Sequence, residues 1–101
     1  MVMHVISQKA LRDFASTHPD ADAPLRAWHK TIRTGTYRNL VELRRTLPSV
    51  DYVPVGKREF YVFNVGGNKC RLLASIHFNR QRSFVRFIMT HREYDRGDWK
   101  K

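Results

Sequence analysis

Hydrophobic and polar residues alternate along three runs in the second half of the chain, with turn-forming residues between them. The first run, Phe60–Val65, is rich in aromatic and β-branched side chains, which suit a half-buried strand. The runs Lys69–Phe78 and Ser83–Met89 follow it. Gly66-Gly67 and the polar segment Asn79–Arg82 separate the runs and carry residues that tight turns favour. The pattern therefore predicts an antiparallel meander of three strands.

Alternation also divides the meander into two faces, because successive side chains of a strand point to opposite sides of a sheet. The core side is predicted to hold Tyr61, Phe63, Cys70, Leu72, Ala74, Ile76, Phe78, Val85, Phe87 and Met89. The opposite side is predicted to hold Val62, Asn64, Lys69, Arg71, Leu73, Ser75, His77, Arg86, Ile88 and Thr90. This second face is mixed and has arginines in the interiors of strands, so it differs from an ordinary core face.

The turns set the register of the predicted strands. A turn at Gly66-Gly67 pairs Phe63 with Cys70, whereas a turn at Gly67-Asn68 shifts the pairing by two residues and keeps both faces. The second turn places Arg71 opposite Thr90. We therefore expect Arg71 to be exposed on the open face, beside the residues that follow the last strand.

The first half of the chain is predicted to contribute helices. The expected elements are a short strand in Met1–Ile6, a helix Gln8–Thr17, a helix between Asp22 and Gly35, a shorter helix in Tyr37–Leu47 and a strand Asp51–Val55. Pro54 puts the last of these at a sheet edge, because proline cannot donate to a strand ladder. One strand, two or three helices and a four-strand antiparallel meander predict an α+β fold with the helices on one sheet face. All 101 residues are expected to form a single domain.

The charge balance narrows the choice of partner. The chain has 19 Lys and Arg against 9 Asp and Glu, a formal net charge of +10. Residues 57–101 hold eleven basic and four acidic residues, so this half contributes +7 of the total. A basic field on a small domain points to a polyanion, and nucleic acid is the first candidate. An inert basic surface is the alternative.

Several classes of protein do not fit the sequence. No apolar run approaches the length of a membrane span, and no signal peptide is visible, so we expect no membrane partner. The single cysteine, Cys70, excludes an internal disulfide and indicates the cytoplasm. Carboxylates and histidines are too dispersed for a two-metal or zinc site, and the fingerprints of nucleotide-binding loops are absent. We therefore expect no metal and no cofactor.

RNA cleavage needs no metal, because the 2′-hydroxyl of RNA is an internal nucleophile. Histidine suits the proton transfer and arginine suits the phosphate charge. The segment THREYDR places His91, Arg92 and Tyr94 just after a strand end, and the register brings Arg71 beside it. The tail Arg96–Lys101 is expected to be loose. Trp99 lies in this tail without a burial pattern, so it either stacks on RNA or has no role.

The stretch YVFNVGGNKCRL, followed by FIMTHREYD, resembles the HigB family of RelE-like toxins, and the N-terminal HVISQKALRDFA is similar to the start of that family. The resemblance implies a RelE-like fold and the toxin of a type II toxin–antitoxin system, an endoribonuclease that cleaves mRNA on the ribosome. By position, Arg71, Arg92 and Tyr94 resemble the family's site residues, and Lys57 and Arg58 resemble its earlier basic pair. With His91, this gives four candidate catalytic residues.

The expected RNA-binding residues are Lys57, Arg58, Lys69, Arg86 and Arg96. The resemblance also implies a HigA-like antitoxin with a helix-turn-helix domain. Two alternatives stay open from the residues themselves. The chain could be a small RNA- or DNA-binding module without catalysis, or a toxin of this fold that acts on a target other than RNA, as in ParE-like relatives.

Overall fold

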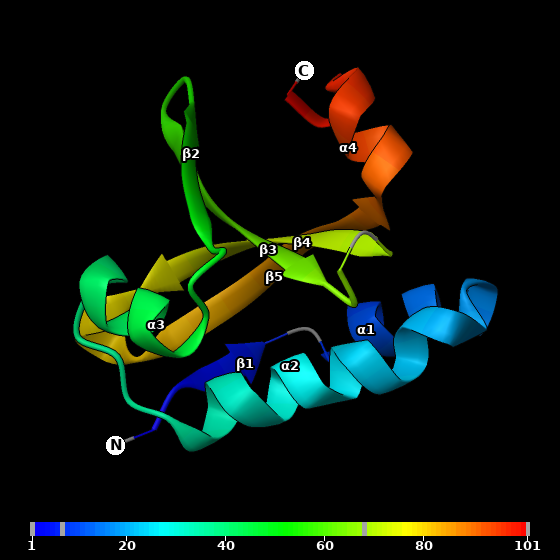
Figure 1. The fold of residues 1–101 in the computed structure, drawn as a ribbon. Helices are drawn as coiled ribbons and strands as arrows, with labels where there is room; N and C mark the ends of the chain where they lie inside the picture. Colours follow the sequence, from blue (N-terminus) through cyan, green and yellow to red (C-terminus); the bar gives the residue numbers. More distant parts are fainter. Residues whose placement is uncertain (1, 7, 68, 101) are drawn as a thin grey trace.

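The protein folds as a five-stranded sheet with two long helices on one face (Figure 1). The computed structural model describes residues 2–6, 8–67 and 69–100. The helices are α1 (Gln8–Thr17), α2 (Asp22–Thr34), α3 (Leu40–Thr46) and α4 (His91–Arg96), with short 3₁₀ turns η1 (Pro19–Ala21), η2 (Phe78–Arg80) and η3 (Asp98–Lys100). The strands are β1 (His4–Ile6), β2 (Asp51–Val55), β3 (Arg58–Val65), β4 (Cys70–His77) and β5 (Arg82–Thr90).

The strand order across the sheet is β1-β5-β4-β3-β2. β2 to β5 form the predicted antiparallel meander, and β2, with Pro54, lies at an edge as expected. β1 occupies the other edge and runs parallel to β5, from His4 opposite Arg82 to Ile6 opposite Phe84. The predicted α+β class is therefore confirmed, and the sheet is mixed because of this one parallel strand.

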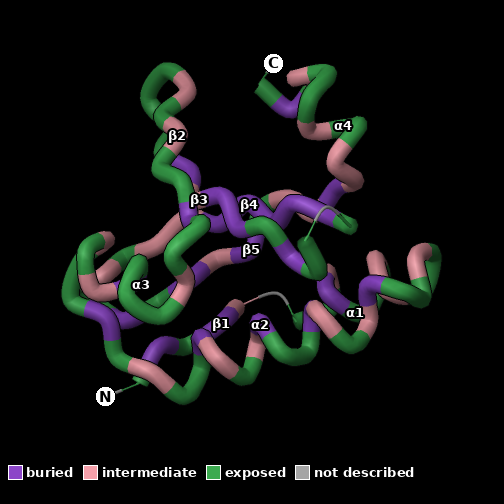
Figure 2. The backbone as a smooth tube through the Cα atoms, in the orientation of Figure 1, coloured by how far each residue is buried: buried purple, intermediate pink, exposed green. Residues whose placement is uncertain are grey.

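The main core lies between the sheet and the helices α1 and α2 (Figures 1 and 2). The apolar stripes predicted from helical spacing face inward: α1 buries Leu11, and α2 buries Leu25, Trp28 and Ile32. We call this group of buried side chains the helix-side cluster; its sheet residues include Phe63, Leu72 and Val85. No helix in the described ranges is long and apolar enough to cross a membrane.

The hairpin between β3 and β4 adopts the second of the two registers that the turn residues allowed. Val65 pairs with Cys70 and Phe63 with Leu72, two residues away from the pairing that a Gly66-Gly67 turn would give. Asn68, the other turn residue in this alternative, lies outside the described residues. Gly66 has a φ of +65°, and a Cβ there would approach the Pro24 side chain at 3.1 Å. A glycine is therefore required both by the backbone conformation and by the close approach of α2.

The register between β4 and β5 differs from the prediction because of a β-bulge. Leu73 pairs with Phe87 but Ala74 pairs with Val85, so Arg86 falls between two registers. The extra residue reverses the alternation in the second half of β5. Phe87 and Met89, predicted for the core side, therefore lie on the opposite face, and Ile88 packs against the helix-side cluster instead. The prediction was wrong for these three residues.

The face opposite α1 and α2 is not bare. It carries a second group of buried side chains, which we call the tail-side cluster: Phe60, Val62, Leu73, Met89 and Trp99. Trp99 belongs to η3 and is only 8% exposed, so the prediction of a loose tail around an unburied tryptophan was wrong. In Figure 1, α4 and the C-terminal end rise on the side of the sheet away from α1 and α2. The C-terminal segment with α4 and η3 thus covers part of this face.

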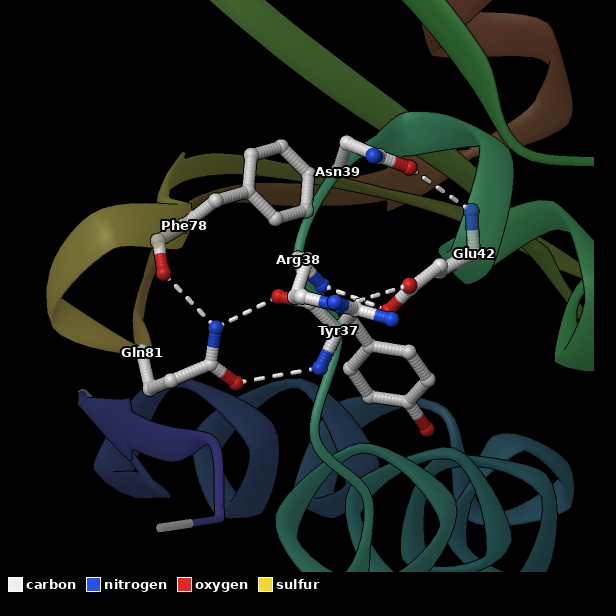
Figure 3. A network of polar contacts seen from close by, with 6 residues as sticks. All are labelled: Tyr37, Arg38, Asn39, Glu42, Phe78 and Gln81. Atoms are coloured by element: carbon white, nitrogen blue, oxygen red, sulfur yellow. Dashed lines mark hydrogen bonds and ion pairs between the residues drawn. The ribbon is translucent and has the colours of Figure 1, made fainter.

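Polar contacts around Gln81 fix the segment that leads into α3 (Figure 3). Gln81 has a left-handed backbone, with φ 51°, and its side-chain amide donates to the carbonyls of Tyr37 and Phe78. The Gln81 Oε1 accepts from the Tyr37 backbone N–H at 3.0 Å. The Asn39 side chain accepts from the Glu42 N–H at 3.0 Å and so caps the N-terminus of α3. This network lies at the start of β5, whereas α4 follows the other end of that strand.

Candidate active site

The candidate site is built on α4, a helix that the sequence starts and stops by local signals. Thr90 and Glu93 form a capping box: the Glu93 N–H donates to Thr90 Oγ1 at 3.2 Å, and the Thr90 N–H donates to Glu93 Oε1 at 2.9 Å. The hydrogen bond from the Thr90 backbone N–H to the Glu93 carboxylate, helped by the Thr90 side chain, holds the pKa of Glu93 below its usual range. Gly97 ends the helix in the left-handed region, at φ 76°. The start and the end of α4 are therefore fixed by the local sequence TxxE…G.

Arg71 lies on β4, opposite Met89 rather than Thr90 as predicted. It is 8% exposed, so the expectation of an exposed residue was wrong. One guanidinium nitrogen lies 2.7 Å from His91 Nδ1, and another donates to the Gly67 carbonyl at 3.4 Å. The Tyr94 ring centroid is 6.0 Å from the guanidinium carbon. The predicted convergence of Arg71 with the segment after β5 is thus present, through side chains instead of a strand pair.

The contacts of His91 define its tautomer. A guanidinium can only donate, so His91 Nδ1 must accept from Arg71 and carry no proton. The proton of the neutral ring then sits on Nε2, which lies 3.2 Å from the Asp95 carboxylate one turn along α4. The side chains form a chain in the order arginine, histidine, aspartate. The His91 side chain is 45% exposed, so solvent and a ligand can reach it.

Tyr94 lies beside Arg71 and is half-buried. Its ring stacks on Trp99, with centroids 5.2 Å apart and an interplanar angle of 11°. Burial raises the pKa of Tyr94 above its usual value, and the charge of Asp51 adds to the rise, while Arg71 opposes it. The phenol therefore keeps its proton at neutral pH, which suits a hydrogen-bond donor and not a base.

Arg58 and Arg86 line a groove on the sheet face opposite α1 and α2. They border a groove of about 370 Å³ together with Glu59, Phe60, Ser75 and Phe87. The Arg58 guanidinium lies over the Phe60 ring at 5.2 Å, and Arg86 donates to Ser75 Oγ at 3.1 Å. Lys57 is exposed in the turn between β2 and β3, next to Arg58. The structure thus brings two predicted RNA-binding arginines together, at the bulge that displaces Arg86.

Three further residues predicted for the site, Lys69, Arg92 and Arg96, lie outside the groove at Arg58 and Arg86. The Lys69 ammonium lies 3.3 Å from the Asp20 carbonyl and 3.7 Å from its carboxylate, toward the helices. Arg92 is exposed on the first turn of α4. Arg96, at the end of α4, is 3.8 Å from Asp98. Of these, Arg92 alone starts from the turn of α4 that carries His91.

Sequence reasoning gave no role to two contributors to the site. Asp95 was visible as the i+4 partner of His91, and that helical spacing was the available signal. The Gly67 carbonyl, which accepts from Arg71, leaves no signal in side-chain chemistry. Among residues 2–6, 8–67 and 69–100, no group of three or more His, Cys, Asp or Glu side chains could hold a metal ion. Cys70 is fully buried, and burial raises the pKa of its thiol to about 11, so it is a core residue as predicted.

The chain is similar to known proteins over most of its length. Residues 21–97 match the family model of HigB toxins, described as the RelE-like toxic component of a toxin–antitoxin system. The chain is 41% identical over 93 residues to the mRNA interferase toxin HigB of Escherichia coli K12. The matched residues make up 92% of this chain and 88% of that protein. It has the same identity to the mRNA interferase HigB of Shigella flexneri, over the same shares of both chains. The mRNA interferase HigB of E. coli O6:H1 is 32% identical over 94 residues, 93% of this chain and 90% of its own length.

Proposed function

Because the chain belongs to the HigB family of RelE-like toxins, we propose that it is an endoribonuclease that cleaves mRNA and so inhibits translation. The relatives are named mRNA interferases, which fits the basic face described above. The observation that carries the proposal is the contact between Arg71 and His91, supported by Asp95. We assign Arg71 to phosphate binding, His91 to proton transfer and Asp95 to orienting the imidazole; the side chains of His91 and Asp95 are open to solvent.

The proposed reaction is attack of the RNA 2′-oxygen on the adjacent phosphorus. A P–O2′ bond forms, the P–O5′ bond breaks, and the products are a 2′,3′-cyclic phosphate and a 5′-hydroxyl. An incoming phosphate competes with His91 for Arg71, since guanidinium–phosphate pairs are bidentate and charge-assisted. Loss of the Arg71 contact frees His91 Nδ1, which takes the proton of the 2′-hydroxyl. Asp95 holds Nε2–H and stabilises the imidazolium that forms, as the carboxylate of a serine-protease triad does.

The other two candidates act on the phosphate and the leaving group. Tyr94 retains its proton, so we assign it as the donor to the departing 5′-oxygen. Arg92, exposed one residue after His91, is assigned as a second contact to the phosphate. The separate groove at Arg58 and Arg86 then holds a neighbouring phosphate of the strand, with Lys57 adding charge at its rim. Lys69 and Arg96 remain candidates for more distant RNA contacts.

The proposal extends to partners. A toxin of this family acts together with an antitoxin. We propose that the antitoxin is HigA-like with a helix-turn-helix domain, that cleavage takes place on ribosome-bound mRNA, and that the protein works in the cytoplasm. Two arginines, Arg58 and Arg86, line the groove on the open face, which supports an RNA strand as the ligand there.

The proposal is tested by end-group analysis of cleaved mRNA. Ribosomes carrying a defined message are incubated with the purified chain or with His91→Gln, and free RNA of the same sequence is treated in parallel. We expect cuts ending in 2′,3′-cyclic or 3′-phosphate, retained when chelator is added, with ribosome integrity checked by sedimentation. Ends with a 3′-hydroxyl would show attack by water and refute the mechanism. RNA binding without cleavage would favour a non-catalytic module, and growth arrest with intact mRNA would favour a ParE-like target.

A further inference from the structure

Trp99 lies two residues beyond the segment that matches the family model, yet it contacts both Tyr94 and Phe60. Its indole N–H donates to the Tyr94 carbonyl at 3.1 Å, and its ring stacks on the Tyr94 ring. On its other side, the Phe60 ring meets it edge to face, with centroids 5.7 Å apart. The chain after α4 therefore folds back and holds Tyr94 from two directions, through backbone and ring.

These contacts join the two halves of the open face. Arg58 lies over Phe60, Phe60 packs against Trp99, Trp99 stacks on Tyr94, and the Tyr94 ring lies near Arg71. Trp99 is 8% exposed and Phe60 is 2% exposed, so neither ring is free to stack on a nucleobase. The role left for Trp99 is to hold other groups. This excludes the stacking on RNA that its place in a basic tail had suggested.

We infer that Trp99 is a positioning residue, which acts through Tyr94 to hold α4 over Arg71 in the geometry that the cleavage reaction needs. This inference rests on the proposed function. The helix α4 has six residues; its Tyr94 packs against the tail-side cluster and its His91 contacts Arg71 on the sheet. Its capping box fixes its start, but its far end is held by Trp99 and the Gly97 turn. Without the indole, the helix can tilt and carry both Tyr94 and His91 away from Arg71.

The chain supplies a matched control in its other tryptophan. Trp28 is 5% exposed in the helix-side cluster and meets the Phe63 ring edge to face at 5.3 Å. Its indole nitrogen finds no hydrogen-bond partner within the described part of the chain. Replacing either tryptophan by leucine removes a similar buried ring, so both variants should lose thermal stability to a similar extent. Only the change at Trp99 is expected to disturb the site.

The test is a double-mutant cycle between Trp99 and Tyr94, measured as mRNA cleavage rate and KM. Trp99→Leu should lower kcat by roughly 10²-fold, the cost of a displacement of about 1 Å at a reacting group, with KM nearly unchanged. Trp28→Leu should leave kcat close to that of the parent. In a Tyr94→Ala background the stacked ring is gone and only the hydrogen bond to the backbone carbonyl of residue 94 remains, so Trp99→Leu should lower kcat much less than it does in the parent. Trp99→Phe keeps the stacked ring but loses the indole hydrogen bond, so it should lower kcat only severalfold.

Two results would overturn the inference while the parent remains active. One is a folded Trp99→Leu protein with the kcat of the parent, and the other is an equal loss of kcat with and without Tyr94. If Trp99→Leu does not fold, Trp99→Phe carries the test, because the loss of the indole hydrogen bond should still lower kcat severalfold, and a kcat equal to that of the parent would then overturn the inference. Fluorescence gives a readout without activity: in Trp28→Phe, Trp99 is the sole tryptophan. Its emission should be that of a buried indole and should shift to the red in Tyr94→Ala. Emission typical of a solvent-exposed indole would show that the contact is absent. An inactive parent would instead refute the proposed function.

Discussion

Removal of the Arg71 side chain should affect stability and catalysis by different amounts. Arg71→Ala deletes the hydrogen bonds to His91 Nδ1, at 2.7 Å, and to the Gly67 carbonyl, at 3.4 Å, from a side chain that is 8% exposed. Hydrogen bonds made by charged groups are worth about 1.5–3 kcal/mol and neutral ones about 1 kcal/mol. The Gly67 bond is long and His91 is open to water, so the expected loss is about 2 kcal/mol. In a domain of this size that corresponds to a fall in Tm of about 8–16 °C.

The loss of activity should be much larger than this loss of stability implies. A group that stabilises charge in the transition state contributes about 10²–10³-fold to kcat. A protein with a free energy of unfolding of about 5–15 kcal/mol stays folded after losing 2 kcal/mol, so unfolding cannot account for such a drop at 25 °C. Arg71→Lys should fall between the parent and Arg71→Ala, because the charge remains and the bidentate geometry is lost.

The measurement is single-turnover cleavage of ribosome-bound mRNA at 25 °C, together with thermal unfolding of each variant. Arg44→Ala is the control: Arg44 donates to the Val50 carbonyl at 3.2 Å at the far end of α3, outside the site. It should lose stability and keep its cleavage rate. The reasoning fails if Arg71→Ala cleaves at the parental rate, or if its activity loss follows its unfolded fraction as the temperature is varied.

Four further outcomes follow from the contacts. His91→Gln should lower the cleavage rate by about 10²–10⁴-fold with RNA binding and Tm nearly unchanged, and undiminished toxicity in growing cells would assign the proton transfer to another group. Thr90→Ala should cost about 1 kcal/mol in urea unfolding by removing the cap of α4, whereas Thr90→Ser should restore it. The pKa of Cys70 is raised to about 11 from 9, so the unfolded state loses its thiol proton first. The contribution of Cys70 to stability should therefore be complete below pH 9 and decrease between pH 9 and 11, and Cys70→Ala should make the alkaline decrease smaller in thermal scans. RNA affinity, measured by filter binding, should fall steeply between 50 and 200 mM salt, because neutralised phosphates release counterions; a flat response would contradict the role of the +10 charge.

The helices and the meander could be predicted because their signals are local. Helix α1 has the bounds Gln8–Thr17 that its apolar spacing and the following His18-Pro19 indicated. The N-cap at Asn39 and the edge position of Pro54 depend on chemistry within a few residues. The parallel pairing of β1 with β5 depends on two segments far apart in the chain, which no local pattern brings together. Local rules therefore gave the elements and the fold class, but not this edge.

One bulge accounts for most of the error in the faces of the sheet. A strict period of two assigns Val85, Phe87 and Met89 to one side, and all three are apolar, so nothing in their pattern indicates an interruption. The extra residue is Arg86, a polar residue that was already expected on the open face. The bulge moves Phe87 and Met89 to that face, where they join the tail-side cluster. Because both faces of this sheet carry buried apolar side chains, the apolar pattern of a strand does not show which face its residues occupy.

The burial of Arg71 and Trp99 has a common physical cause. A sheet face with Phe60, Val62, Leu73 and Met89 exposes too much apolar surface to stay in water, so another element must cover it. Helices α1 and α2 occupy the other face, and the C-terminal segment brings Tyr94 and Trp99 to this one. Its docking brings α4 against the sheet and leaves Arg71 between β4 and that helix. The same step that completes the core of the open face therefore assembles the arginine–histidine–aspartate chain. Weakening the tail-side cluster should lower activity before it unfolds the helix-side cluster, since only the first of the two holds the site.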